Sequence, residues 1–184
     1  MKLIENIKNK AGLFYFKREI ERKTQRVKAV NIASAKYIGL LYLVEDEKQD
    51  KFICDFVKEM QMHKKDVKAL GFVKTKTIPY FCYPKLTFDY FTPKDLNWYN
   101  KPSNKFVSSF IKREFDILIN LNTASDLTLH YIAMQSAAKF KVGRFDKFPF
   151  DFYNLMISNY EDKNQENFIK NILYYLNEIN FTKK

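Results

Sequence analysis

The chain has 184 residues, of which 46% are hydrophobic and 29% are charged, a composition that fits one globular domain and argues against disorder. No apolar run is long enough to cross a bilayer, and the first residues carry charge where a secretory signal would be apolar, so we expect neither membrane insertion nor export. Lysine and arginine exceed aspartate and glutamate by 32 to 21, and this net charge of +11 is typical of proteins with an anionic partner.

The excess positive charge is concentrated in residues 1–30, which we expect to form a basic helical arm. This segment holds nine basic residues against three acidic ones, a net charge of +6. Leu3, Ile4 and Ile7 share one helical face, and the aromatic residues 14–16 precede Lys17 and its basic neighbours. Such an arm suits a phosphate backbone. A terminal helix packed on the domain with its charges in water is an equally good interpretation. A bias toward AT-rich codons would supply many lysines, but it would enrich glutamate as well and so leaves the excess of positive charge unexplained.

A βαβ unit is predicted next, because two apolar runs flank an amphipathic helix. Tyr37–Val44 is apolar throughout, as expected for a strand covered on both faces, and Val67–Val73 has the same character. Asp46 and Gln49 have the spacing of a capping box at the start of the helix. The apolar face of this helix comprises Phe52, Ile53, Phe56, Val57 and Met60. Such a unit implies parallel strands joined by a right-handed crossover.

Residues 77–104 are predicted to be a loop insertion with at most one short strand, Leu86–Tyr90. Four prolines interrupt the segment, and proline cannot donate to a central ladder. Its dense aromatic side chains form either a lid on the core or a binding surface. Cys82 lies in this loop, where solvent exposure is left open, whereas Cys54 lies on the apolar face of the first helix and is expected in the core. With no CxxC pair, a reducing compartment, the cytoplasm, is predicted.

Regular structure is predicted again after residue 105. We expect a helix around residues 106–111, a buried strand at Phe115–Leu121 and a helix at Asp126–Ala138. A short strand at Phe140–Val142, closed by Gly143, and a last strand at Phe152–Ile157 follow.

The final helix has the clearest pattern, with Asp162 and Gln165 in capping-box spacing before it. Its predicted buried stripe comprises Phe168, Ile169, Ile172, Leu173, Leu176 and Ile179. The alternation of strands and helices predicts an α/β fold with a three-layer, doubly wound, mainly parallel sheet, that is, a Rossmann-like domain over residues 31–184. The first two strands should lie side by side at its centre, flanked by Phe115–Leu121.

The familiar catalytic signatures are missing. The chain has four glycines and none of the glycine-rich phosphate loops, and it has no nucleophile elbow. Its two histidines, His63 and His130, have no second ligand at metal spacing, and we expect His130 at the surface or in an interface. We therefore expect neither a metal nor a cofactor, and we favour a role other than catalysis.

The best candidate ligand site comes from topology, because open α/β sheets bind ligands beyond the carboxyl ends of their strands. The polar residues after the strand at Phe115–Leu121 lead into a helix N-terminus, which favours an anion. These candidate residues are Asn120, Asn122, Thr123, Ser125 and Asp126. The alternative is that Thr123, Ser125 or Asp126 merely caps the helix.

The stretch FDILINLNTASDLTLHYIAMQSAAKFKVGRF resembles an uncharacterised family of small Bacteroidetes proteins. Their shared pattern is FD, a hydrophobic strand ending in a polar residue, HYI, and then FKVG, and the resemblance extends over about residues 37–145. The same stretch is more distantly similar to the N-terminal half of heptosyltransferase-like glycosyltransferases. The first resemblance implies a Rossmann-like fold, and the second makes a nucleotide sugar a candidate ligand.

Three functional hypotheses follow. The first is a non-enzymatic protein that associates with RNA or the ribosome through the basic arm and the aromatic loop. Its candidate contacts are Lys17, Arg18, Arg22, Lys23, Arg26, Tyr83, Lys85, Trp98 and Tyr99. The alternative is a small-molecule-binding domain or enzyme that uses the strand-end site. A third is a protein-interaction module that presents the aromatic loop 80–99.

Overall fold

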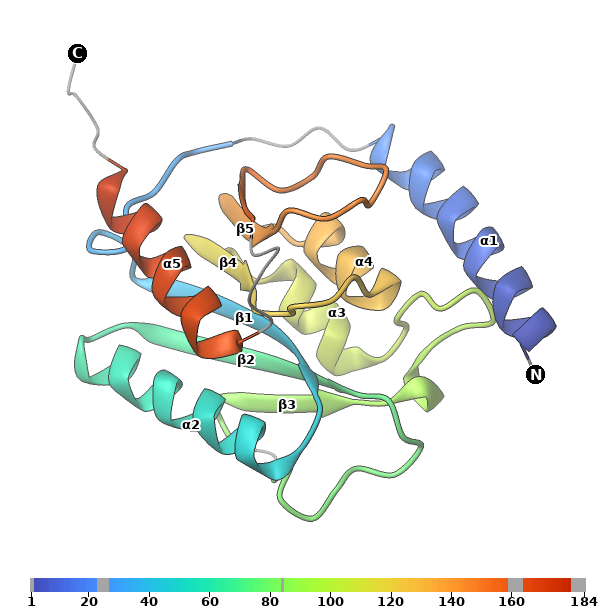
Figure 1. Ribbon diagram of the computed structural model, residues 1–184, viewed down its shortest axis with the longest axis horizontal. Helices are drawn as coiled ribbons and strands as arrows, with labels where there is room; N and C mark the ends of the chain where they lie inside the picture. Colours follow the sequence, from blue (N-terminus) through green and yellow to red (C-terminus); the bar gives the residue numbers. More distant parts are fainter. Residues whose placement is uncertain (1, 23–26, 84, 159–163, 180–184) are drawn as a thin grey trace.

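The computed structural model describes residues 2–22, 27–83, 85–158 and 164–179, and they form an α/β domain around one parallel sheet (Figure 1). The sheet has six strands in the order β3-β2-β1-β4-β5-β6, and all neighbouring strands are parallel. The strands are β1 (Tyr37–Val44), β2 (Asp66–Val73), β3 (Phe88–Phe91), β4 (Ile117–Asn120), β5 (Phe140–Arg144) and β6 (Leu155–Ile157). This is the strand order of the Rossmann fold, so the predicted fold class is confirmed.

Helices cover both faces of the sheet and complete three layers. Figure 1 shows α2 (Glu47–Met62) and α5 (Gln165–Glu178) on one face. On the other face lie α1 (Lys2–Ile20), α3 (Lys105–Lys112) and α4 (Leu127–Gln135). No helix in the described part of the chain is long and apolar enough to cross a membrane.

The predicted βαβ unit is confirmed. β1 pairs with β2 along its whole length, and β4 flanks β1 on the other side. The side chain of Asp46 accepts a hydrogen bond from the N–H of Gln49 (2.8 Å), and the Gln49 side chain accepts one from the N–H of Glu45 (3.2 Å). These bonds start α2, whose buried face includes Ile53, Phe56, Val57 and Met60, as the helical spacing predicts.

A buried carboxylate lies between α2 and the sheet. Asp50 is 3% exposed and accepts hydrogen bonds from the hydroxyls of Tyr42 (2.8 Å) and Tyr90 (3.1 Å). Cys82, whose exposure the sequence left open, is buried, and burial and the nearby charge of Asp50 raise the pKa of its thiol to about 12. The thiol therefore stays protonated at neutral pH, which suits a structural role in the core.

Several details of the later elements differ from the predictions. The N-cap of α5 is Asn164, whose side chain accepts from the N–H of Glu166 (2.8 Å), and Asp162 lies outside the described residues. Leu173 is only partly buried, whereas its neighbour Ile172 is buried. Gly143 lies within β5 and does not close it. A Cβ at this position would lie 2.6 Å from the Tyr153 ring, so glycine is needed for the close approach of that ring.

The N-terminal helix α1 packs on the domain, so the basic arm is not confirmed. Phe16 is fully buried, and its ring contacts four aromatic rings at centroid distances of 5.0–5.5 Å; these belong to Tyr131, Phe148, Phe150 and Phe152. The hydroxyl of Tyr131 donates to the carbonyl of Gly12 (3.0 Å). The predicted apolar face is not the docking face, since Ile7 is 57% exposed.

Candidate functional site

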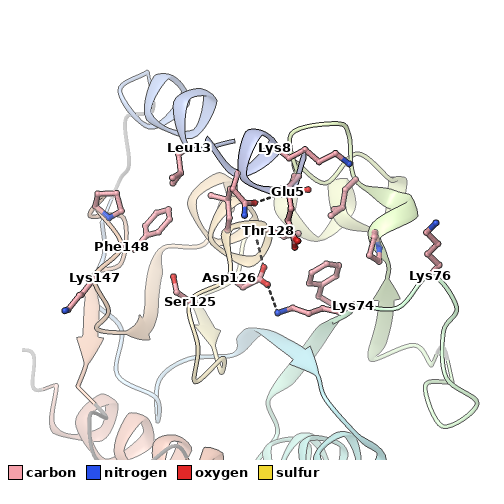
Figure 2. Close-up of a pocket in the computed structure, with 17 residues that line it drawn as sticks. Glu5, Lys8, Leu13, Lys74, Lys76, Ser125, Asp126, Thr128, Lys147 and Phe148 are labelled. Atoms are coloured by element: carbon pink, nitrogen blue, oxygen red, sulfur yellow. Dashed lines mark hydrogen bonds and ion pairs between the residues drawn. The ribbon is translucent and has the colours of Figure 1, made fainter. Parts of the chain in front are cut away.

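A cleft of about 1070 Å³ opens where the first half of α1 faces the carboxyl edge of the sheet and the start of α4. Figure 2 shows the side chains that line it. Its apolar wall is supplied mainly by Leu13, Phe72, Pro93, Leu96, Leu127, Phe148 and Pro149. These side chains come from α1, the end of β2, the loop after β3, α4 and the loop after β5. Elements far apart in the sequence therefore meet at the end of the sheet where α/β proteins bind ligands.

Four exposed lysines stand around this apolar wall: Lys8, Lys74, Lys76 and Lys147. Two carboxylates, Glu5 and Asp126, also line the cleft, so its lining carries a net positive charge. Lys74 reaches toward Asp126, with 3.5 Å between Nζ and Oδ2 (Figure 2). Among the described residues, the other three lysines form no salt bridge, and their charges are available to an anion in the cleft.

The N-terminus of α4 is capped by Asp126, which is one of the two interpretations of this turn. The Asp126 carboxylate accepts hydrogen bonds from the N–H groups of Thr128 (3.0 Å) and Leu129 (3.2 Å). These two N–H groups are therefore already occupied by protein. The positive field of the cleft comes from its lysines and not from the free end of the helix.

The structure divides the strand-end residues into two groups. Ser125 and Asp126 line the cleft. Asn120 and Asn122 are buried in the turn, where the N–H of Asn122 donates to Asn120 Oδ1 (3.2 Å). The carbonyl of Thr123 accepts a hydrogen bond from Arg144. Asn120, Asn122 and Thr123 thus shape the turn, and Ser125 and Asp126 are the members that line the cleft.

A buried histidine connects this turn to the loop after β5. His130 is 3% exposed, so its predicted surface location is wrong. Its Nε2 lies 3.0 Å from Ser125 Oγ and 3.4 Å from Asp146 Oδ2. Its Nδ1 lies 3.3 Å from the hydroxyl of Tyr153, which accepts a hydrogen bond from Asn120 Nδ2 (2.7 Å).

The electrostatics of this cluster keep Asp146 ionised and Tyr153 protonated. Burial alone would raise the pKa of Asp146, but hydrogen bonds from His130, the N–H of Phe148 and Ser125 outweigh it and lower that pKa below its usual value. Burial raises the pKa of the Tyr153 hydroxyl. Ser125 and Asp146 face the same nitrogen of His130, which is not the arrangement of a serine-nucleophile triad, where they face opposite nitrogens.

The structure brings the predicted nucleic-acid contacts together only in part. Lys17 and Arg18 are exposed at the C-terminal end of α1, Arg22 is exposed in the turn after it, and Lys23 and Arg26 lie outside the described residues.

The aromatic members separate into two places. Trp98 and Tyr99 pack against Tyr15 of α1, with ring centroids 6.2 and 4.5 Å away. Tyr83 and Lys85 belong to the segment between β2 and β3, which passes beside α2 in Figure 1 and contacts it through the hydrogen bond that the Tyr80 hydroxyl donates to Glu47 (2.6 Å).

The chain was compared with known proteins at three levels. The model of DUF6913, a family of unknown function, matches residues 8–179. The chain belongs to this family. Neither the curated proteins nor the solved structures gave a significant match. The resemblance to an uncharacterised family is thus confirmed, while these comparisons show neither a Bacteroidetes origin nor a similarity to heptosyltransferase-like glycosyltransferases.

Proposed function

We propose that this domain binds an anionic small molecule with an apolar part, of the class of nucleotides and nucleotide sugars, in the cleft between α1 and the carboxyl edge of the sheet. The observation that carries the proposal is the ring of four lysines around an apolar wall. The volume of about 1070 Å³ is close to the upper end of the roughly 300–1,000 Å³ that is usual for ligand pockets.

The two parts of the cleft suit the two parts of such a ligand. Apolar side chains such as Phe72 and Phe148 gain from covering an aromatic ring. Lysine is a common phosphate ligand, and several lysines at one opening also attract an anion from solution. Because the glycine-rich phosphate loops are absent, the charge has to come from side chains.

A fluorescence titration with anilinonaphthalene sulfonate tests the proposal, since this dye combines aromatic rings with an anionic sulfonate. We expect one saturable site whose affinity falls as salt rises. Changing Lys8, Lys74, Lys76 and Lys147 together to glutamine should weaken binding by about 30-fold, at about 0.5 kcal/mol for each exposed ion pair. AMP and a nucleotide sugar should displace the dye from the wild-type protein.

The matched control changes four exposed lysines outside the cleft, Lys48, Lys51, Lys105 and Lys112, to glutamine. Both variants lose four positive charges, so they differ only in where the charges were. The control should bind the dye as the wild type does. Equal affinities of the two variants, or no displacement by any phosphate compound, would contradict the proposal.

A second candidate function, binding of single-stranded RNA, is supported by the outer surface of α1. Phe14 (64% exposed) and Trp98 (58% exposed) both contact the ring of Tyr15, and the exposed Lys17 and Arg18 follow on the same helix. Exposed aromatic rings beside cations suit stacked bases and a phosphate backbone. Fluorescence anisotropy with a labelled oligonucleotide should show a steep salt dependence that Lys17→Gln with Arg18→Gln reduces. Unchanged slopes would exclude this surface.

A further inference from the structure

A chain of hydrogen bonds with one direction ends at the cleft. It begins at Asn120, whose Oδ1 accepts from the N–H of Asn122 (3.2 Å). A backbone N–H can only donate, so this contact fixes the orientation of the amide. Asn120 Nδ2 is therefore the group that faces Tyr153, and it donates to the tyrosine oxygen (2.7 Å).

The orientation of Asn120 favours one set of proton positions on the next two side chains. The Tyr153 oxygen accepts from Asn120, so its own proton is available for His130 Nδ1, 3.3 Å away. A nitrogen that accepts carries no proton, so donation from Tyr153 to Nδ1 would leave the neutral imidazole with its proton on Nε2. That N–H faces Ser125 Oγ (3.0 Å) and Asp146 Oδ2 (3.4 Å).

In this tautomer His130 donates to Ser125 and does not take a proton from it. The Ser125 hydroxyl can donate its own hydrogen bond to a further acceptor, and Asp146 and a ligand in the cleft compete for that bond. Ser125 lines the cleft, whereas Asp146 lies outside its lining. Asp146 also accepts from the N–H of Phe148 (2.9 Å), so its charge keeps hydrogen-bond partners when Ser125 turns away.

We infer that Ser125 donates its hydroxyl hydrogen bond to the oxyanion of the ligand, a phosphate or sulfonate group, and that Asn120, Tyr153 and His130 are positioning residues that orient it. The inference rests on the proposed function. It adds a specific donor to the lysines, which as exposed, flexible cations give attraction but little directionality. Hydrogen bonds that point the same way also polarise one another, which strengthens the terminal donor.

The proton positions can be measured without any ligand. The chain has only two histidines, so a long-range ¹H–¹⁵N spectrum of the imidazoles, with His63→Gln for assignment, identifies His130 directly. We expect the tautomer protonated at Nε2 in the wild type, and loss of that preference in Tyr153→Phe. An Nδ1-protonated ring in the wild type would overturn the inference.

The donor role is tested with anilinonaphthalene sulfonate as the probe. Ser125→Ala should weaken binding by about 10- to 100-fold, the effect of losing one hydrogen bond to a charged group. Ser125→Thr, which keeps the hydroxyl, should restore most of the affinity. The control Ser109→Ala removes an exposed hydroxyl on α3, outside the cleft, and should change nothing.

His130 is tested by two substitutions that differ in hydrogen bonding. The amide of His130→Gln keeps a donor near the position of Nε2 and should retain binding better than His130→Leu. Urea unfolding of each variant shows whether it is folded at the temperature of the titration. Lysine-dependent binding that Ser125→Ala leaves unchanged would overturn this inference alone, whereas wild-type binding that does not depend on the cleft lysines would overturn the proposed function as well.

Discussion

Phe16→Ala should destabilise the protein strongly, because α1 is an integral part of the fold. The Phe16 ring is fully buried among four aromatic rings. Truncating a buried phenylalanine to alanine costs about 3–5 kcal/mol, from lost burial and from the cavity that remains. That is a large part of the roughly 5–15 kcal/mol by which a domain is stable.

Phe14→Ala is a matched control on the same helix. Phe14 is 64% exposed, so its loss should change the free energy of unfolding by about 0.5 kcal/mol or less. Both substitutions replace phenylalanine by alanine, so their effects on helix propensity are alike and cancel in the comparison.

Urea unfolding followed by circular dichroism measures both variants. We expect Phe16→Ala to lower the midpoint with an unchanged slope, which indicates that stability has changed and not the surface exposed on unfolding. Equal midpoints for the two variants would show that α1 is not docked through Phe16. The cleft would then lack the wall that α1 provides, and the proposed ligand site would be wrong.

Three further predictions concern stability and are checked by the same unfolding assay. Ile172 lies on the buried face of α5 and is 1% exposed. Ile172→Ala should lower the free energy of unfolding by about 2–5 kcal/mol, and wild-type stability would show that α5 does not pack there. Tyr42→Phe removes the 2.8 Å hydrogen bond to the buried Asp50 and should cost about 1–3 kcal/mol; no loss would mean that Asp50 is satisfied without it. Burial would raise the pKa of Asp116, but hydrogen bonds from Lys139 and two backbone N–H groups lower it. The contribution of Asp116 to the free energy of unfolding is therefore complete above the unfolded-state pKa of about 3.9 and is lost as pH falls through the folded-state pKa. Asp116→Asn should be less stable than the wild type at neutral pH, and its stability should depend less on pH in acid. Parallel pH profiles of wild type and variant would refute this.

The sheet was predictable because its strands are buried on both faces. A strand such as β1 (Tyr37–Val44) has to be apolar throughout, and the helix that follows has to be apolar on one side. The spacing of apolar residues along the sequence therefore distinguishes the two kinds of element. Helix boundaries were harder to predict, since several residues before α5 are able to cap it and only the fold selects Asn164. Packing of α1 on the domain was one of two interpretations of the sequence, but its docking face was not predictable: Phe16, and not the stripe that includes Ile7, meets the aromatic cluster.

The candidate site was predictable only in part. The polar turn after β4 follows from topology, and Ser125 and Asp126 do line the cleft. The same rule applied to β2 would have identified Lys74 and Lys76, which follow the end of that strand. Asp146 and Tyr153 lie in a loop with no recognisable motif, and only the path of the chain places them beside His130. A single sequence contains no local signal for such contacts.

The most direct test of the proposed function is a crystal structure of the protein with anilinonaphthalene sulfonate bound. The proposal predicts the aromatic rings against Phe72 and Phe148, and the sulfonate among the lysines of the cleft and within hydrogen-bond distance of Ser125 Oγ. Dye bound only elsewhere, for example on the exposed surface near Trp98, would contradict the central claim that this cleft is the ligand site.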